Sequence, residues 1–161
     1  MNIRISSVRE IKDSRSSVVD KNPIRRGRPD PLDPRLECPL GRLRLDGKIS
    51  DSEYYAGCRW RRIYLDWLSS IGAPNPFPRA IDYDSYTEAQ ESLGSNLDDE
   101  DAELIAKAFR AGETVLKRLG PRVFHSVNAI AVYEEPEELG DFEFTAAAAK
   151  KGLAALAEVF C

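Results

Sequence analysis

Residues 50–72 read SDSEYYAGCRWRRIYLDWLSSIG and open with a strong signal for a helix start. Ser50 and Glu53 have the spacing of a capping box, in which each side chain bonds to the backbone amide of the other residue. The apolar and aromatic residues that follow recur at helical spacing and end before Gly72, a common stop signal. They are Gly57, Trp60, Tyr64, Trp67, Leu68 and Ile71. The stretch predicts one long amphipathic helix whose aromatic face is buried.

A shorter helix is expected upstream, at 39–45. Leu32, Leu36, Leu40 and Leu43 recur at helical spacing, and Asp46-Gly47 is a stop signal. Three further helices are expected downstream, at about 98–119, 121–133 and 145–160.

The helix expected at 98–119 begins with Asp98, Asp99, Glu100 and Asp101. Carboxylates in a first turn are favoured by the positive end of the helix dipole, and no calcium-loop spacing follows them. We therefore interpret them as helix-start residues rather than as a metal site. The expected apolar face of this helix comprises Leu104, Ile105, Ala108, Val115, Leu116 and Leu119.

The last two expected helices also have their own start and stop residues. Pro121 suits a first helical position, and Glu134-Glu135-Pro136 ends that helix. Thr145 is the expected N-cap of the final helix. The expected apolar faces comprise Val123, Phe124, Val127, Ile130 and Ala131 in the first of these helices, and Ala149, Leu153, Leu156 and Phe160 in the second.

The fold class that follows is mainly α: a small bundle of about four to five helices with a flexible N-terminal tail. Residues 1–35 are predicted to be a flexible basic tail, since they lack a sustained apolar period; Ile3, Ile5 and Val8 give at most a short strand. Residues 36–161 are predicted to form the helical domain. Within that domain, the three prolines at 73–80 are expected to form a rigid connector, and 81–96 is expected to be a loop with one weak helical turn.

Charge is divided unevenly along the chain, although the net charge is only −4. Residues 1–62 hold 15 Lys/Arg against 9 Asp/Glu, whereas residues 63–161 hold 8 against 18. Such a division indicates a basic arm for a polyanion and an acidic body, or two faces that attract each other in a dimer.

No stretch has the length and apolarity of a membrane span, and no apolar signal-peptide segment follows Met1. Cys38, Cys58 and Cys161 lack metal-ligand spacing, and their odd number argues against a disulfide framework. We expect reduced thiols in a cytoplasmic protein that does not bind membranes.

No enzyme signature is present. The single histidine, His125, lies in an expected helix without a Ser, Asp or Cys arrangement around it, and we interpret it as structural or solvent-facing. The glycines do not form a phosphate-binding loop. We therefore expect a non-enzymatic protein without a cofactor or a bound metal.

The sequence Ile24-Arg25-Arg26-Gly27-Arg28-Pro29 resembles the AT-hook, a minor-groove motif with the core Arg-Gly-Arg-Pro. Arg26, Gly27, Arg28 and Pro29 match this core and Arg25 matches its basic flank. The glycine lets the backbone enter a narrow groove while the arginines extend along its floor, where A·T tracts concentrate negative potential. The resemblance implies contact with A·T-rich DNA. Asp30 departs from the pattern, and its carboxylate should weaken binding to phosphates.

A second resemblance spans about residues 32–160. Four stretches resemble, in order, an uncharacterised domain of alphaproteobacteria and their phages: Asp33-Pro34-Arg35, Pro39-Leu40-Gly41-Arg42-Leu43, Gly47-Lys48-Ile49-Ser50 and Tyr54-Tyr55-Ala56-Gly57. That family often ends in a helical hairpin resembling a helix-turn-helix, and Leu153-Ala154-Ala155-Leu156-Ala157 matches its ending. The resemblance implies a regulator of phage or prophage type.

The expected recognition helix is poorly suited to reading DNA. It offers only Lys150 and Lys151 among alanines, and the turn before it, at 134–138, is acidic. A protein-docking role for this helix is the alternative.

Two functional hypotheses follow. The first is a DNA-associated regulator that uses the basic arm, with Arg59, Arg61 and Arg62 of the long helix as further contacts, and an acidic body for a partner such as RNA polymerase or a second copy. The second is a phage-derived interaction or assembly protein that does not bind DNA.

Overall fold

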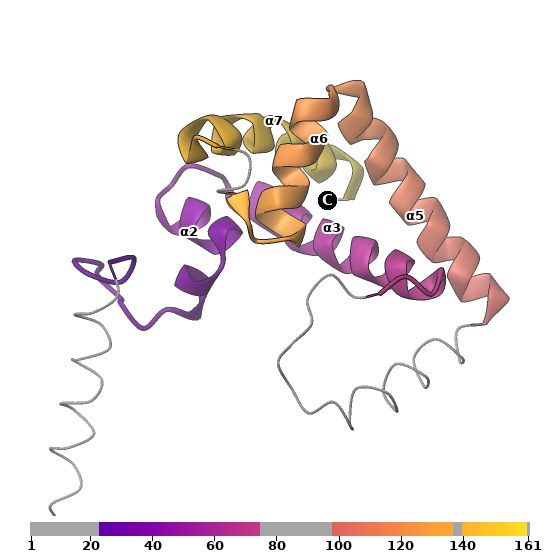
Figure 1. Cartoon of the computed structure of the whole chain (residues 1–161), viewed down its shortest axis with the longest axis horizontal. Coiled ribbons are helices and arrows are strands. Elements are labelled where there is room, and N and C mark those ends of the chain that lie inside the picture. The colour runs from indigo at the N-terminus through magenta and orange to yellow at the C-terminus, as the bar shows by residue number, and fades with distance from the viewer. Residues whose placement is uncertain (1–22, 75–97, 137–139, 161) are drawn as a thin grey trace, which may run out of the picture.

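The computed structural model of the chain describes residues 23–74, 98–136 and 140–160. These residues contain five α-helices and no strand, which confirms the prediction of a small all-α bundle. The helices labelled in Figure 1 are α2 (Pro39–Leu45), α3 (Asp51–Ser70), α5 (Asp99–Arg118), α6 (Pro121–Val127) and α7 (Phe142–Phe160). A 3-10 helix, η1 (Pro34–Glu37), precedes α2, and a π-helical turn, η2 (Asn128–Val132), continues α6.

Several predictions fall outside the described residues. They are the strand at Ile3, Ile5 and Val8, the loop at 81–96, Cys161 and most of the connector at 73–80. Only residues 23–35 of the predicted tail are described. The predicted boundary between residues 35 and 36 falls inside η1, where Asp33 and Leu36 are buried.

Helix α3 is the centre of the arrangement. It contacts α2 near its start and α5, α7 and η2 along its length. Helix α6 crosses the middle of the bundle in Figure 1 and contacts both α5 and α7. Among the described residues, 23–38 and α2 lie at one end of the bundle in Figure 1, and α5 lies at the other.

The predicted capping box starts α3. The Glu53 amide donates to Ser50 Oγ at 3.3 Å, and the Ser50 amide donates to Glu53 Oε2 at 2.6 Å. The aromatic stripe packs against the core as expected up to Trp67: Gly57 and Trp60 are buried, and Tyr64 and Trp67 are partly buried. Ile71 is 57% exposed. The helix ends at Ser70, so Ile71 is a cap residue beyond the packed face.

Trp60 lies fully buried at the centre of the core. Its indole Nε1 donates to the side-chain oxygen of Asn128 at 2.9 Å, and its ring stacks on Phe109 at 5.5 Å between centroids. Gly112 lies directly against the indole: a Cβ there would be 2.5 Å from Trp60 Cζ3. The missing side chain is therefore what allows α5 to approach α3 this closely.

The predicted apolar face of α5 is partly wrong. Leu104 and Leu119 are 59% and 45% exposed, whereas Phe109, Gly112 and Leu116 are buried. Leu104 lies on the opposite side of the helix from Phe109, and Leu119 lies past the last helical residue. The expected face included leucines and no glycine, although Gly112 lies directly against the Trp60 ring.

The predicted start of α7 is also wrong. The helix begins three residues before Thr145, and Thr145 is buried inside its first turn. Asp141 caps the start instead: its side chain accepts from the Glu143 amide at 2.9 Å, and its carbonyl accepts from the Thr145 amide at 3.0 Å. Phe142 packs against the core, so the longer helix buries one more aromatic ring.

Replacing Gly112 with alanine should destabilise the protein by about 1–3 kcal/mol, because the added methyl overpacks the Trp60 ring. Urea unfolding measures this change. The exposed neighbour Ala111 provides the control: Ala111→Gly isolates helix propensity and should cost about 1 kcal/mol. A Gly112→Ala variant that gained stability by that same amount would contradict the close approach.

Candidate nucleic-acid interface

The hook-like segment is folded into turns rather than extended. The Arg28 amide donates to the Arg25 carbonyl at 3.4 Å, and Gly27 has a φ of 75°, in the left-handed region that glycine tolerates. This local geometry directs the flanking arginines back onto the protein. Arg26 and Pro29 are exposed.

Both flanking arginines pair with carboxylates further along the chain. Arg25 donates to Glu37 Oε1 at 2.8 Å and to the Pro31 carbonyl at 2.7 Å, and its side chain is only 13% exposed. Arg28 pairs with Asp46, the residue that caps the C-terminal end of α2. An AT-hook extends its arginines along a groove floor, so both pairs would have to open before these residues could bind DNA in that way.

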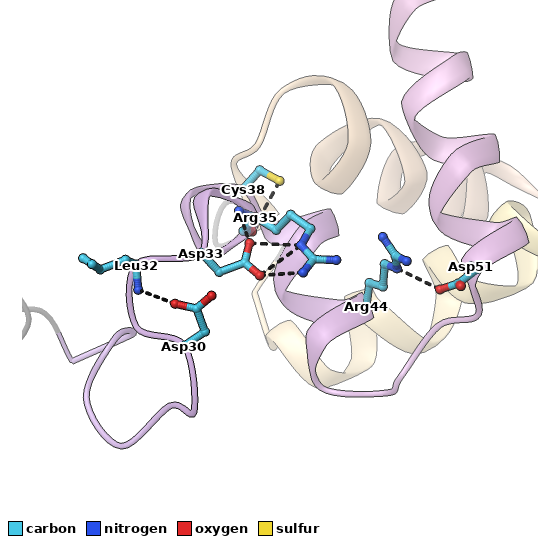
Figure 2. A network of polar contacts seen from close by, with 7 residues as sticks. All are labelled: Asp30, Leu32, Asp33, Arg35, Cys38, Arg44 and Asp51. Atoms are coloured by element: carbon cyan, nitrogen blue, oxygen red, sulfur yellow. Dashed lines mark hydrogen bonds and ion pairs between the residues drawn. The ribbon is translucent and has the colours of Figure 1, made fainter.

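Two more arginines, Arg35 and Arg44, also pair with carboxylates, as Figure 2 shows. Asp33 accepts from the Arg35 amide at 2.9 Å and from Arg35 Nη2 at 2.6 Å, which caps η1. These hydrogen bonds lower the pKa of the Asp33 carboxyl to about 2. The same pairing raises the pKa of the Arg35 guanidinium.

Arg44, on α2, links that helix to the start of α3. Its Nε donates to Asp51 Oδ1 at 2.8 Å, which raises the pKa of the guanidinium (Figure 2). The guanidinium also lies 4.8 Å from the ring centroid of Tyr54 and 5.5 Å from that of Tyr55. Tyr55 is 58% exposed, whereas the Arg44 side chain is 21% exposed, so the aromatic ring is the more accessible member of this pair.

We call Arg25, Arg28, Arg35 and Arg44 the arginine face. Each guanidinium pairs with one carboxylate, yet residues 23–48 hold seven Lys/Arg against four Asp/Glu, a net of +3. Partly exposed ion pairs contribute little to stability. Phosphate oxygens can therefore replace these carboxylates as partners, since a guanidinium binds both groups through the same pair of N–H donors.

The arginines predicted on α3 do not act as one group. Arg59 donates to the Phe160 carbonyl at 2.8 Å, at the end of α7, and Arg61 pairs with Glu134. Arg62 lies 3.8 Å from Asp66 and its side chain is 85% exposed. The three side chains thus have three different partners on three segments of the chain.

Lys150 and Lys151 are exposed on α7, but one face of that helix is buried in the core. Ala149, Leu153 and Leu156 are fully buried against other helices. The chain between η2 and α7 spans residues 133–141, longer than the three or four residues that join the helices of a helix-turn-helix. The geometry therefore gives no support to α7 as a recognition helix.

Arg35, Arg44 and Tyr55 were not among the DNA-binding residues predicted from the sequence. One signal was available: Asp33-Pro34-Arg35 places a capping aspartate two residues before an arginine, a pattern typical of a local turn. Arg44 pairs with a residue of the next helix, which no local pattern indicates.

Within the described ranges, no three His, Cys, Asp or Glu side chains gather closely enough to hold a metal ion. The same ranges include no helix with the length and apolar character needed to cross a membrane. His125 is exposed on α6.

The Asp33–Arg35 pair makes a prediction about acid stability. Because folding lowers the pKa of Asp33 from 3.8 to about 2, its contribution is complete above pH 4 and is lost as the pH falls toward 2. In Asp33→Asn the melting temperature should therefore fall less steeply across this window. Arg35→Met should flatten the profile in the same way, and unchanged slopes in both variants would disprove the coupling.

Comparison with known proteins gave no match: neither a family model, nor a curated protein, nor a solved structure is similar to the chain. The AT-hook-like and phage-domain resemblances stay predictions.

Proposed function

We propose that this chain is a non-enzymatic, DNA-associated regulatory protein that contacts DNA weakly through its arginine face. The observation that supports the proposal is that four arginines of one segment with a net charge of +3 each pair with a carboxylate on η1, at a cap of η1 or α2, or at the start of α3. They are Arg25, Arg28, Arg35 and Arg44. Phosphate contacts supply most of the affinity of such surfaces, and they make it strongly dependent on salt.

Because the arginines are already paired with carboxylates, DNA binding can be weak and can still favour A·T-rich over G·C-rich sequences. Arg35, Arg44 and the exposed ring of Tyr55 can contact a phosphate backbone without any change in the hook segment. Entry of Arg25 and Arg28 into an A·T-rich minor groove is a second step, which requires release from Glu37 and Asp46. A fully exposed ion pair costs about 0–1 kcal/mol to open. Release of Arg25 costs more, because its side chain is largely buried and it also gives up the hydrogen bond to the Pro31 carbonyl.

In this proposal the acidic half of the chain provides the protein contacts. Residues 63–161 hold 8 Lys/Arg against 18 Asp/Glu, so this part would be repelled by DNA. A partner such as RNA polymerase, or the basic segment of a second copy, would be attracted to it.

Fluorescence anisotropy with short A·T-rich and G·C-rich duplexes, at low and at near-physiological salt, tests the proposal. Arg35→Ala/Arg44→Ala should weaken binding to both duplexes. Glu37→Gln/Asp46→Asn, which frees the hook arginines, should tighten binding to the A·T-rich duplex by roughly 2- to 10-fold.

A matched control separates hook release from a change in net charge. Glu103→Gln/Glu158→Gln removes two exposed carboxylates from α5 and α7, far along the chain from the hook. It should not alter the preference for the A·T-rich duplex. Equal tightening in both double variants would exclude the hook step, and no binding at low salt would exclude the DNA-associated function.

A protein-interaction or assembly role without DNA is the second candidate. It is favoured by one observation: Arg25 and Arg28 are already partnered by carboxylates, the groups that an acidic protein segment would present. Absence of DNA binding in every variant, together with a dimer by sedimentation, would favour this role.

A further inference from the structure

A cleft of about 290 Å³ lies between α3 and the α6–η2 segment, on residues other than the arginine face. Its walls are built from the aromatic rings of Tyr64, Phe124 and Tyr133, with Asn128 among them. His125 and Glu135 are exposed and also line it. No step of the proposed DNA contact uses this cleft.

Asn128 gives the cleft a hydrogen-bond donor that no side chain or backbone group of the described residues uses. It is 3% exposed, and its Oδ1 is fixed as an acceptor because Trp60 Nε1 can only donate. The amide nitrogen Nδ2 must then point away from Trp60, and it has no acceptor among the described residues.

That nitrogen opens on the cleft. Among the described residues, every side-chain nitrogen or oxygen that is closed to solvent has a hydrogen-bond partner. Asn128 Nδ2 lacks a partner, so it must keep some access to solvent, and the cleft is the cavity that Asn128 lines. A buried amide with an unused donor normally calls for a partner.

The surroundings hold this donor rigidly. Asn128 begins the π-helical turn η2, whose five residues are all buried. After the turn, Glu134 has a φ of 59°, which non-glycine residues rarely adopt, and its carboxylate pairs with Arg61 of α3. Wide π turns of this kind are frequent at functional sites.

The other walls indicate the chemistry of the ligand. The hydroxyl groups of Tyr64 and Tyr133 are hydrogen-bonded at 2.7 Å, and burial raises the pKa of Tyr64, so that phenol stays neutral. Aromatic walls favour a planar ring. Glu135 disfavours an anion and can accept from an N–H group. A volume of about 290 Å³ suits one small heterocycle.

We propose that this cleft binds an uncharged planar heterocycle, with a carbonyl that accepts a hydrogen bond from Asn128 Nδ2 and an N–H group that donates to Glu135. Nucleobase-like lactams such as uracil and hypoxanthine have this pattern of acceptor and donor. Affinity for such fragments should be roughly millimolar, given their few atoms.

Saturation-transfer NMR with uracil and hypoxanthine on the full chain tests the proposal, with benzene as a ring that lacks polar groups. Asn128→Asp keeps the acceptor for Trp60 but exchanges the donor for a carboxylate oxygen. It should weaken uracil binding by about tenfold or more. His125→Trp should also abolish binding, because the larger ring fills the mouth of the cleft.

His125→Ala is the matched control, since it leaves the mouth open and should retain binding. Arg35→Ala/Arg44→Ala should retain it as well, which separates this site from the arginine face. If Asn128→Asp does not fold, the comparison of His125→Trp with His125→Ala tests the site, because His125 is exposed and its substitution should not affect folding. No signal from either heterocycle, equal signal from benzene, or binding unchanged in His125→Trp would overturn the proposal.

Discussion

The hydrogen bond from Trp60 Nε1 to Asn128 Oδ1 is the interaction on which the rest of the structure depends. A buried indole must satisfy its N–H group, and the acceptor comes from a residue 68 positions later in the chain. The bond fixes α3 against the α6–η2 segment, and Gly112 lets α5 close over the same ring. It also sets the direction of the remaining Asn128 amide group, so core packing and the aromatic cleft are parts of one arrangement.

The fold follows from the sequence where the signals are local. The capping box at Ser50 and Glu53, the helix at 39–45 and the burial of Trp60 are each specified by residues within a few turns of one another. The predictions are wrong where tertiary packing determines which residues are buried or where a helix begins. Gly112 carries no hydrophobic signal, and Asp141 and Thr145 are both good N-caps until the burial of Phe142 selects the earlier one. The π-helical turn has no sequence pattern that we recognised.

The candidate site was less predictable than the fold. The motif at 25–29 is visible in the sequence, but the state of its arginines depends on carboxylates 12 and 18 residues away. Those ion pairs depend on the turns at 23–27 and on the position of α2. The charge pattern of the sequence specifies neither of these. A basic motif read in isolation therefore overstates the charge that it offers, because the fold neutralises part of it.

The burial of the Trp60 indole has a consequence for how the molecule opens. Its N–H hydrogen is both shielded from water and bonded, so it can exchange with deuterium only when α3 and η2 separate. The indole of Trp67, only partly buried in the same stripe, experiences a wetter environment. The indole hydrogens of the two tryptophans should therefore exchange at different rates. The rate for Trp60 reports the opening of the core, and the rate for Trp67 reports motions nearer the surface.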